Sequence, residues 1–360
     1  MRLSTDYDYL CFMLEAIDLT KRYEDGHLAL DALNLRIEPG EIFFLLGANG
    51  AGKSTTLNLC LDFIRPTSGW ALVNGVEVRS NPAETRRHIA YVSENVMLYG
   101  DFTARENLDF FTRLTGKRLD RRDYYQAMRR VGLPEESFER KLKTFSKGMR
   151  QKVEIAALLL KDADNMVMDE PTSGLSSTDS EKVIMLLKEQ THRGRLVVVN
   201  IHQPSSEIYK LFDRLWLLDT GGYPIYDGNP IEAITYFKRI ANYTDQDISV
   251  CGTCGNINPE LILTIIDAKK IDDSGNQTNI RKITSKEWHE LYVASRPKFQ
   301  EVKPTPLPPN HQQKPSIWKQ FCIFLERNIK TKLTNKQYLC IALLETPLLA
   351  VIVALLTRFV

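Results

Sequence analysis

The residues best suited to chemistry are the glycines, lysine and hydroxyls of one short segment. Residues 47–54 read Gly-Ala-Asn-Gly-Ala-Gly-Lys-Ser and directly follow the apolar run Ile42–Leu46. The glycines let backbone N–H groups curl around phosphate oxygens, and a helix that begins here turns its positive end toward the anion. The Lys53 ammonium can then reach the β and γ phosphates, and the Ser54 hydroxyl can ligate Mg²⁺. The segment therefore predicts a nucleotide-binding site.

A pair of carboxylates ends a second apolar run. Met166–Met168 is followed by Asp169 and Glu170, an arrangement in which one carboxylate holds Mg²⁺ and the other orients or deprotonates a water. An acidic pair at a strand end is more often a solvated turn, but the phosphate loop upstream favours the catalytic interpretation. His202 follows a third apolar run, Leu196–Val199. Taken alone it is more often a structural histidine, but its place after a buried strand, in this order of motifs, makes it a candidate site residue.

The elements that position these side chains follow from the pattern of apolar residues. Over residues 12–235, apolar runs alternate with helical stretches, which predicts an α/β domain with a mainly parallel sheet. The three runs named above are continuously apolar, as strands covered on both faces are. Ala71–Val78, broken by an Asn-Gly pair, predicts an antiparallel hairpin. Residues 95–165 predict a helical insertion, with helices over Arg105–Leu114 and Arg121–Val131.

Composition excludes several classes of protein. The chain is 43% hydrophobic and 26% charged with a net charge of +2, so it is globular and has no bias toward nucleic acid. Its six cysteines are scattered, which predicts a reducing compartment. Cys251 and Cys254 have the spacing of half a zinc site, but no matching second pair is evident. The acidic N-terminus lacks the features of a signal peptide, so the catalytic body is expected in the cytoplasm.

The region after residue 295 changes character. Six prolines within residues 296–316 predict an extended linker. Residues 317–337 predict an amphipathic connecting helix on a membrane surface, because apolar side chains recur at helical spacing with basic residues between them. The apolar positions of this helix are Trp318, Phe321, Leu325 and Ile329.

The last apolar segment is about long enough to cross a bilayer. Tyr338–Leu356 is apolar apart from three residues that include Glu345, and it predicts a transmembrane helix over residues 338–357. Lys330, Lys332 and Lys336 precede it, which predicts that the preceding body lies on the cytoplasmic side. The alternative is a buried core helix of a soluble protein, in which Glu345 would avoid contact with lipid.

In type and order, these motifs resemble the ATP-binding subunit of ABC (ATP-binding cassette) transporters. The resemblance implies a P-loop NTPase cassette over residues 12–240, with a mainly parallel core, an antiparallel β subdomain and a helical subdomain, and a C-terminal extension over 241–295. The stretch His202–Ile208 and the later Gly228-Asn229-Pro230 resemble the White or G-type branch. Half-transporters of that branch place the cassette before the membrane helices, as here.

The resemblance also implies roles for single residues. Gly47–Thr55 is the Walker A loop, Asp169 is the Walker B carboxylate, and Glu170 is the catalytic base. Tyr23 stacks on adenine, and His202 is the switch that contacts the γ phosphate. The implied ligands of Mg²⁺ are Ser54, Glu94 and Asp169. The positions implied to contact ATP are Tyr23, Gly47, Asn49, Gly50, Ala51, Gly52, Lys53, Ser54, Thr55, Ser146 and Gly148.

Residues 145–149 correspond to the family signature, which contacts ATP bound to the opposite subunit. Lys147 stands where the signature usually has Gly, which leaves Ser146 and Gly148 to face the phosphate. Glu94 stands where the family usually has a Gln that contacts Mg²⁺, and a carboxylate can serve the same metal. Ser176 replaces an Asp that typically couples the two ATP sites.

The expected function is an ATPase subunit that couples ATP-driven dimerisation of cassettes to solute export, with ATP and Mg²⁺ as cofactors. Its expected partners are a second cassette, identical or different, the lipid bilayer, and further spanning helices from the same intact chain or from a separate permease. Two alternatives are a mechanical ABC ATPase outside transport and a silent membrane-tethered regulator. The first usually carries two cassettes or a long coiled coil, and this sequence shows neither. The second is disfavoured because Lys53, Asp169, Glu170 and His202 are all intact.

Overall fold

The computed structural model describes residues 14–93, 98–243, 257–271, 276–295 and 315–357. Contacts divide the chain into two compact units. The first unit comprises Met1–Val96 and Asp162–Asn310, and the second comprises Met97–Lys161 and His311–Val360. Most of the predicted linker, residues 296–314, lies outside the described residues.

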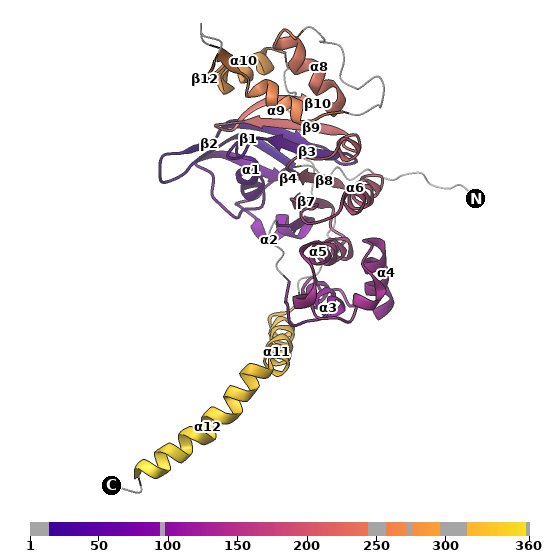
Figure 1. The fold of residues 1–360 in the computed structure, drawn as a ribbon, viewed down its shortest axis with the longest axis vertical. Helices are drawn as coiled ribbons and strands as arrows, with labels where there is room; N and C mark the ends of the chain where they lie inside the picture. The colour runs from indigo at the N-terminus through magenta and orange to yellow at the C-terminus, as the bar shows by residue number, and fades with distance from the viewer. Residues whose placement is uncertain (1–13, 94–97, 244–256, 272–275, 296–314, 358–360) are drawn as a thin grey trace, which may run out of the picture. The chain divides into compact units, whose positions relative to one another are not determined.

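A six-stranded sheet forms the centre of the first unit (Figure 1). All its strand pairs are parallel except the pair at one edge, β10 with β9. The strands of the three predicted apolar runs are buried along their whole length, which accounts for their continuous apolar sequence. In order across the sheet, the strands are β10 (Tyr223–Gly228), β9 (Arg214–Asp219), β3 (Ile42–Gly47), β8 (Leu196–Asn200), β7 (Asn165–Asp169) and β6 (Ile89–Val92).

A second, antiparallel sheet of four strands belongs to the same unit. It confirms the predicted hairpin, whose turn residues Asn74 and Gly75 have positive φ values of 54° and 75°, as a tight hairpin turn requires. Its apolar face packs with residues of β3 in one core cluster. The strand order is β2 (Leu28–Ile37), β1 (Leu14–Arg22), β4 (Ser68–Val73) and β5 (Val76–Glu77).

Helix α1 (Lys53–Cys60) begins inside the phosphate loop. Beside β10, helix α10 (Ser285–Ser295) buries Trp288, whose ring packs edge-on against Phe237. The Arg281 guanidinium of β12 (Gln277–Arg281) donates to the buried Asp219 carboxylate at 2.8 Å. The other elements of this unit are α2 (Pro82–Thr85), a 3-10 turn (Arg86–His88), α6 (Ser177–Thr191), α7 (Ser206–Tyr209), α8 (Pro230–Ile240), α9 (Glu260–Ile266) and β11 (Lys269–Ile271).

The second unit is helical, as predicted for the insertion. Helix α3 (Ala104–Leu114) begins at a capping box in which Thr103 and Glu106 satisfy each other's backbone N–H groups. Helix α4 (Arg121–Arg130) ends just before Gly132, whose φ of 71° suits a helix stop. Both helices begin and end within a residue of the predicted positions. The remaining elements are α5 (Lys147–Lys161), α11 (Ile317–Thr334), α12 (Lys336–Thr357) and the 3-10 turns Glu135–Ser137 and Leu142–Thr144.

The connecting helix α11 is shorter than predicted, and the side chain that it buries is not one of the four apolar positions named in the prediction. It ends at Thr334, before the predicted residue 337. Ile323 is its buried side chain and packs with Phe102 and Phe110. The predicted apolar face, which was expected to meet a membrane surface, is exposed, with 73% of Trp318 accessible. Apolar side chains occur on more than one side of this helix. The spacing of apolar residues alone therefore did not identify the side that packs against α3.

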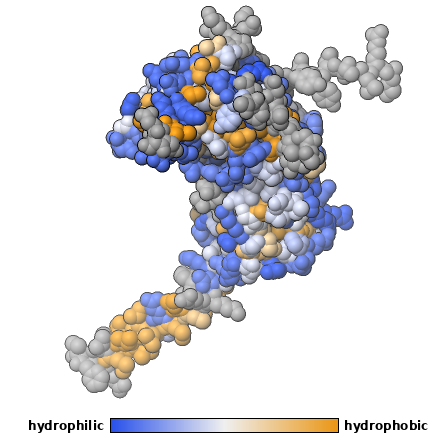
Figure 2. Space-filling model, turned by 45° about the horizontal axis from the view of Figure 1, so that its top comes forward, coloured by the Kyte–Doolittle hydropathy of each residue, from blue (hydrophilic) through white to orange (hydrophobic). Residues whose placement is uncertain are grey.

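The predicted transmembrane segment corresponds to α12, whose described side chains are mostly apolar and exposed, with the charged Glu345 among them (Figure 2). Taken singly, no helix in the described ranges meets the length and hydropathy expected of a membrane span. Together, α11 and Leu339–Leu355 meet that criterion, with a bend of 79° between them. A single spanning helix over residues 338–357 therefore remains a prediction.

Candidate functional site

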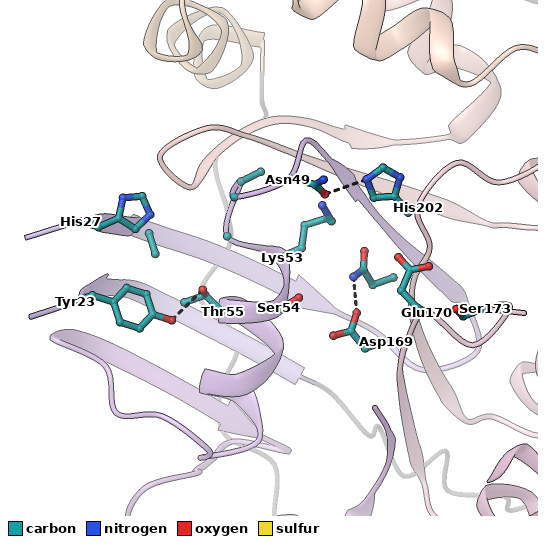
Figure 3. Close-up of a pocket in the computed structure, with 15 residues that line it drawn as sticks. Tyr23, His27, Asn49, Lys53, Ser54, Thr55, Asp169, Glu170, Ser173 and His202 are labelled. Atoms are coloured by element: carbon teal, nitrogen blue, oxygen red, sulfur yellow. Dashed lines mark hydrogen bonds between the residues drawn. The ribbon is translucent and has the colours of Figure 1, made fainter. Parts of the chain in front are cut away.

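The phosphate loop joins the end of β3 to the start of α1 (Figure 3). Gly47 and Gly52 have φ values of 154° and 98°. A Cβ atom on Gly47 would lie 2.2 Å from the Leu218 carbonyl oxygen, and one on Gly52 would lie 2.6 Å from the Ala29 carbonyl oxygen. Both positions therefore require glycine because of their close packing as well as their backbone conformation.

The Lys53 side chain lies over this loop and is only 8% exposed. Its ammonium donates to the carbonyl oxygens of Gly47, at 2.7 Å, and Ala48, at 3.0 Å. Burial lowers the pKa of Lys53, whereas the nearby carboxylates of Glu170 and Asp169 raise it. The lysine and the two carboxylates thus act on one another within one site.

The acidic pair lies at the carboxyl end of β7. Asp169 is register partner to Asn200 at the end of the neighbouring parallel strand β8. The Asn200 amide donates to the Asp169 carboxylate at 2.5 Å, and both residues are buried. Glu170 follows with a positive φ of 54°, and its backbone N–H donates to the Asn200 carbonyl at 2.9 Å. Asn200 therefore holds both residues of the acidic pair in place.

Two aromatic side chains lie further along the same site. The Tyr23 hydroxyl lies 3.2 Å from the Thr55 hydroxyl in α1. The Nε2 atom of His202 lies 2.9 Å from the Asn49 side-chain oxygen, so the loop after β8 contacts the phosphate loop (Figure 3). Both contacts link a predicted site residue to the loop that would hold the phosphates.

One cavity of about 490 Å³ brings these groups together. It contains residues from the β1–β2 turn, the phosphate loop, and the ends of β7 and β8. Its polar lining includes carboxylate, hydroxyl and ammonium groups, a donor set suited to a phosphorylated ligand with a hard cation. The lining residues are Tyr23, His27, Ala29, Asn49, Gly50, Ala51, Gly52, Lys53, Ser54, Thr55, Asp169, Glu170, Ser173, Asn200 and His202.

Two predicted site positions, Ser146 and Gly148, do not line this cavity. Ser146 and Gly148 belong to the second unit, at the start of α5, where the Ser146 hydroxyl accepts from the Met149 backbone N–H at 3.2 Å. Glu94 falls outside the described residues, as do Cys251 and Cys254. Within the described ranges, no group of three or more His, Cys, Asp or Glu side chains is placed to hold a metal ion.

Several lining residues were missed by the sequence analysis. Asn200 could have been found as a polar residue at the end of a continuously apolar strand. His27 lies four residues after Tyr23 in the same turn, a spacing that brings the two together only once the strands pair. Ala29 and Ser173 carry no sequence signal of this kind.

Comparisons with known proteins identify the family of the chain. The sequence family described as ABC transporter matches residues 30–173. The ABC transporter ATP-binding protein NatA of Bacillus subtilis is 33% identical over 227 residues, which cover 58% of this chain and 87% of that protein. The chain therefore belongs to the family of ABC transporter ATP-binding proteins.

Protein white of Drosophila melanogaster is 30% identical over 348 residues, covering 88% of this chain and 48% of that protein. Mouse ATP-binding cassette sub-family G member 5 is 27% identical over 343 residues, which cover 88% of this chain and 50% of that protein. The chain thus spans about half the length of these relatives. The predicted resemblance to ABC cassettes, with the White and G-type proteins among them, is confirmed.

A solved dimeric structure of a bacterial ABC transporter cassette superimposes with a TM-score of 0.55 at 26% identity, covering 60% of this chain and 98% of that one. The same cassette has been solved in a dimeric post-hydrolysis state bound to ADP and Pi, with the same score and coverage. The predicted cassette fold of mixed sheets and helices is therefore confirmed for the first part of the chain.

Proposed function

We propose that this chain binds Mg-ATP in the cavity of the first unit and hydrolyses its γ phosphate. The observation that carries the proposal is the meeting of Lys53, Ser54, Asp169, Glu170 and His202 around one cavity that opens on a glycine-rich loop. Phosphoryl transfer needs a cradle for the anion, oxygen ligands for a metal and a group that positions water, and this cavity contains side chains of each kind.

Each side chain has a proposed task. The Lys53 ammonium exchanges its loop carbonyls for β and γ phosphate oxygens. The carboxylate of Glu170 orients the attacking water and accepts its proton, while the imidazole of His202 contacts the γ phosphate. The Tyr23 ring stacks on the base. The remaining predicted contacts to the phosphates are the backbone and side chains of Gly47 and residues 49–55.

The residues also fit a magnesium ion. Mg²⁺ prefers oxygen ligands and is usually held by one or two carboxylates together with substrate phosphates and water. The Ser54 hydroxyl and Asp169 carboxylate supply such oxygens, and Glu94 is proposed as a further ligand. This accords with the lack of an all-protein metal cluster among the described residues. When bound, the ion neutralises charge on the transferred phosphoryl group.

A second cassette, identical or different, is proposed to complete the site. The signature residues Ser146 and Gly148 stand at the start of α5, a helix of 15 residues whose N-terminal N–H groups suit an anion. They line no part of the cavity, so a partner's copy of this helix is proposed to face the γ phosphate. The dimeric structures of the similar bacterial cassette support this arrangement.

Transport of a solute is the proposed use of this ATPase. Protein white and the mouse sub-family G member 5 are each about twice as long as the matched region. The apolar helix α12 after the connecting helix α11 is proposed as the membrane-inserted part, with the cassette on the cytoplasmic side. Further spanning helices, from the intact chain or a separate permease, are proposed to form the solute pathway.

The decisive experiment uses Glu170→Gln, which keeps size and hydrogen bonding but removes the base. We expect phosphate release to slow by about 100-fold or more, while Mg-ATP still binds and dimers accumulate in light-scattering measurements. Glu260→Gln makes the same change at an exposed position of α9 and should leave both readouts unchanged. Wild-type turnover by Glu170→Gln would contradict the assigned base, and a lack of dimers at saturating Mg-ATP would contradict the shared site.

A further inference from the structure

The turn that carries Tyr23 also carries a second ring. His27 lines the same cavity, and its imidazole ring is nearly parallel to the Tyr23 ring, with an interplanar angle of 15° and a centroid separation of 6.4 Å. We propose that His27 is a second base-contacting residue, so that the purine of the bound nucleotide contacts both rings. This inference rests on the proposed function and assigns one more residue to the same site.

The backbone holds the two rings at a fixed spacing. The turn connects β1 to β2, and the Tyr23 N–H donates to the His27 carbonyl at 2.9 Å. The Gly26 N–H donates back to the Tyr23 carbonyl at 3.0 Å, and the Asp25 carboxylate accepts from the His27 N–H at 2.9 Å. Gly26 has a φ of 86°, which favours glycine in this tight turn. A turn tied in this way presents a preorganised pair of rings.

Tyr23 is already engaged around its ring. The Lys21 ammonium lies over the ring, 5.1 Å from its centroid, and donates to the Arg65 carbonyl at 2.7 Å. The Tyr23 hydroxyl, at the tip of the side chain, lies within hydrogen-bonding distance of the Thr55 hydroxyl. The Lys21 ammonium thus occupies one face of the Tyr23 ring, which leaves the other face for a nucleobase. The adjacent ring of His27 enlarges that limited aromatic surface.

The chemistry of His27 suits the base better than the phosphates. A purine has two fused rings, so it can contact two neighbouring side-chain rings at once, and the centroid separation lies within the range of aromatic pairs. The imidazole also carries nitrogen atoms that can donate to or accept from the edge of a base. The phosphate-binding groups, Lys53 and the loop N–H groups, come from a different segment of the chain.

The test separates base contacts from phosphate contacts. Affinity is measured on the full chain by calorimetry for Mg-ATP and by competition for inorganic tripolyphosphate with Mg²⁺, which has no base. We expect His27→Ala to weaken Mg-ATP about tenfold and to leave tripolyphosphate within twofold of wild type. His27→Phe retains an aromatic ring and should bind Mg-ATP within about threefold of wild type. His192→Ala removes an exposed histidine at the end of α6 as the matched control.

Each outcome decides the proposal. Equal weakening of Mg-ATP and tripolyphosphate would show that His27 serves the phosphates or the fold, and unchanged Mg-ATP affinity would show that it contacts nothing in the ligand. Failure of His27→Phe to restore affinity would exclude an aromatic contact. If the wild-type chain itself bound no Mg-ATP, the proposed function would fail instead, so the two failures are distinguishable.

Discussion

At the scale of single residues, the environment of Lys53 suits it to bind an anion. It is buried, burial lowers its pKa, and its partners are two carbonyl oxygens of its own loop. Phosphate oxygens carry more negative charge than those carbonyls, so a triphosphate is expected to displace them. The nearby carboxylates of Glu170 and Asp169 raise the pKa of Lys53 against the larger effect of burial.

Replacing Lys53 by alanine should therefore remove charge-assisted hydrogen bonds that the rest of the loop cannot replace. We expect Mg-ATP affinity to fall roughly 10- to 100-fold, as the loss of hydrogen bonds to a charged group implies. Calorimetric titration measures the change. Lys182→Ala, at an exposed position of α6, is the control. Equal affinity of wild type and Lys53→Ala would mean that the phosphates bind elsewhere.

Asn200 provides a second prediction at this scale, because its side-chain amide donates a hydrogen bond to the Asp169 carboxylate. In Asn200→Ala, the Asp169 carboxylate loses its donor and its fixed orientation. We expect the Mg²⁺ concentration for half-maximal ATPase activity to rise about tenfold, which corresponds to roughly 1.4 kcal/mol. A metal titration at saturating ATP measures it. An unchanged metal dependence would show that Asn200 does not position the metal ligand.

The sequence predicted the parts of the site that lie next to one another along the chain. The phosphate loop and the acidic pair are recognisable because each follows an apolar run within a few residues. Asn200 and His27 depend instead on strand pairing, since β8 brings the amide beside Asp169 and the β1–β2 turn brings the imidazole beside Tyr23. Such contacts arise between segments and leave little local signal.

At the scale of elements, the connecting helix α11 is attached to α3 by polar as well as apolar contacts. The Arg113 guanidinium donates to the Glu326 carboxylate at 2.8 Å. Arg327 donates to the Tyr99 hydroxyl at 2.9 Å, and Phe324 packs edge-on against Phe110. The spacing of apolar residues predicted a helix here, but it did not predict which side of the helix contacts α3. That contact depends on residues of α3, which precede α11 by some 200 residues in the chain.

The Arg113–Glu326 pair makes this attachment dependent on pH. The hydrogen bond from Arg113 lowers the pKa of Glu326. A carboxyl group whose pKa is lower in the folded state stabilises that state above its unfolded pKa, and this contribution is lost as pH falls through the folded pKa. The side chain of Glu326 is 45% exposed, so solvent weakens the effect. We expect α11 to detach more readily in acid than at neutral pH.

Glu326→Gln should remove that dependence. At neutral pH we expect amide hydrogen exchange in α11 to accelerate by up to about fivefold relative to wild type, as for an exposed ion pair. At a pH below the folded pKa of Glu326 the two proteins should exchange alike. Lys319→Gln changes an exposed residue of the same helix and serves as the control. Identical exchange of wild type and Glu326→Gln at neutral pH would show that the pair does not hold α11.

At the scale of the whole molecule, the ATP-binding cassette is followed along the chain by the apolar helix α12, whose side chains are largely exposed among the described residues. Figure 2 shows the apolar surface of α12. Its exposed side chains include Leu344 at 68% and Leu348 at 64%. A contiguous apolar surface of this kind usually meets lipid or another protein. The proposed membrane location accounts for it, and Glu345 within the helix would then need a neighbouring helix as its partner.

Membrane insertion of α12 can be tested with one substitution. An arginine near the middle of a spanning helix raises the free energy of membrane insertion by about 2.5–3.5 kcal/mol. Leu348 is exposed, so replacing it should not disturb a buried core. We therefore expect less of the Leu348→Arg variant of the 360-residue chain to stay with liposomes after alkaline carbonate extraction. Its partition coefficient between liposomes and solution should be lower than that of wild type by about 50-fold or more. Gln126→Arg adds the same charge to the exposed surface of α4 and should leave extraction unchanged. If carbonate released wild type and Leu348→Arg equally, α12 would lie outside the bilayer, and its apolar surface would have to be covered by protein.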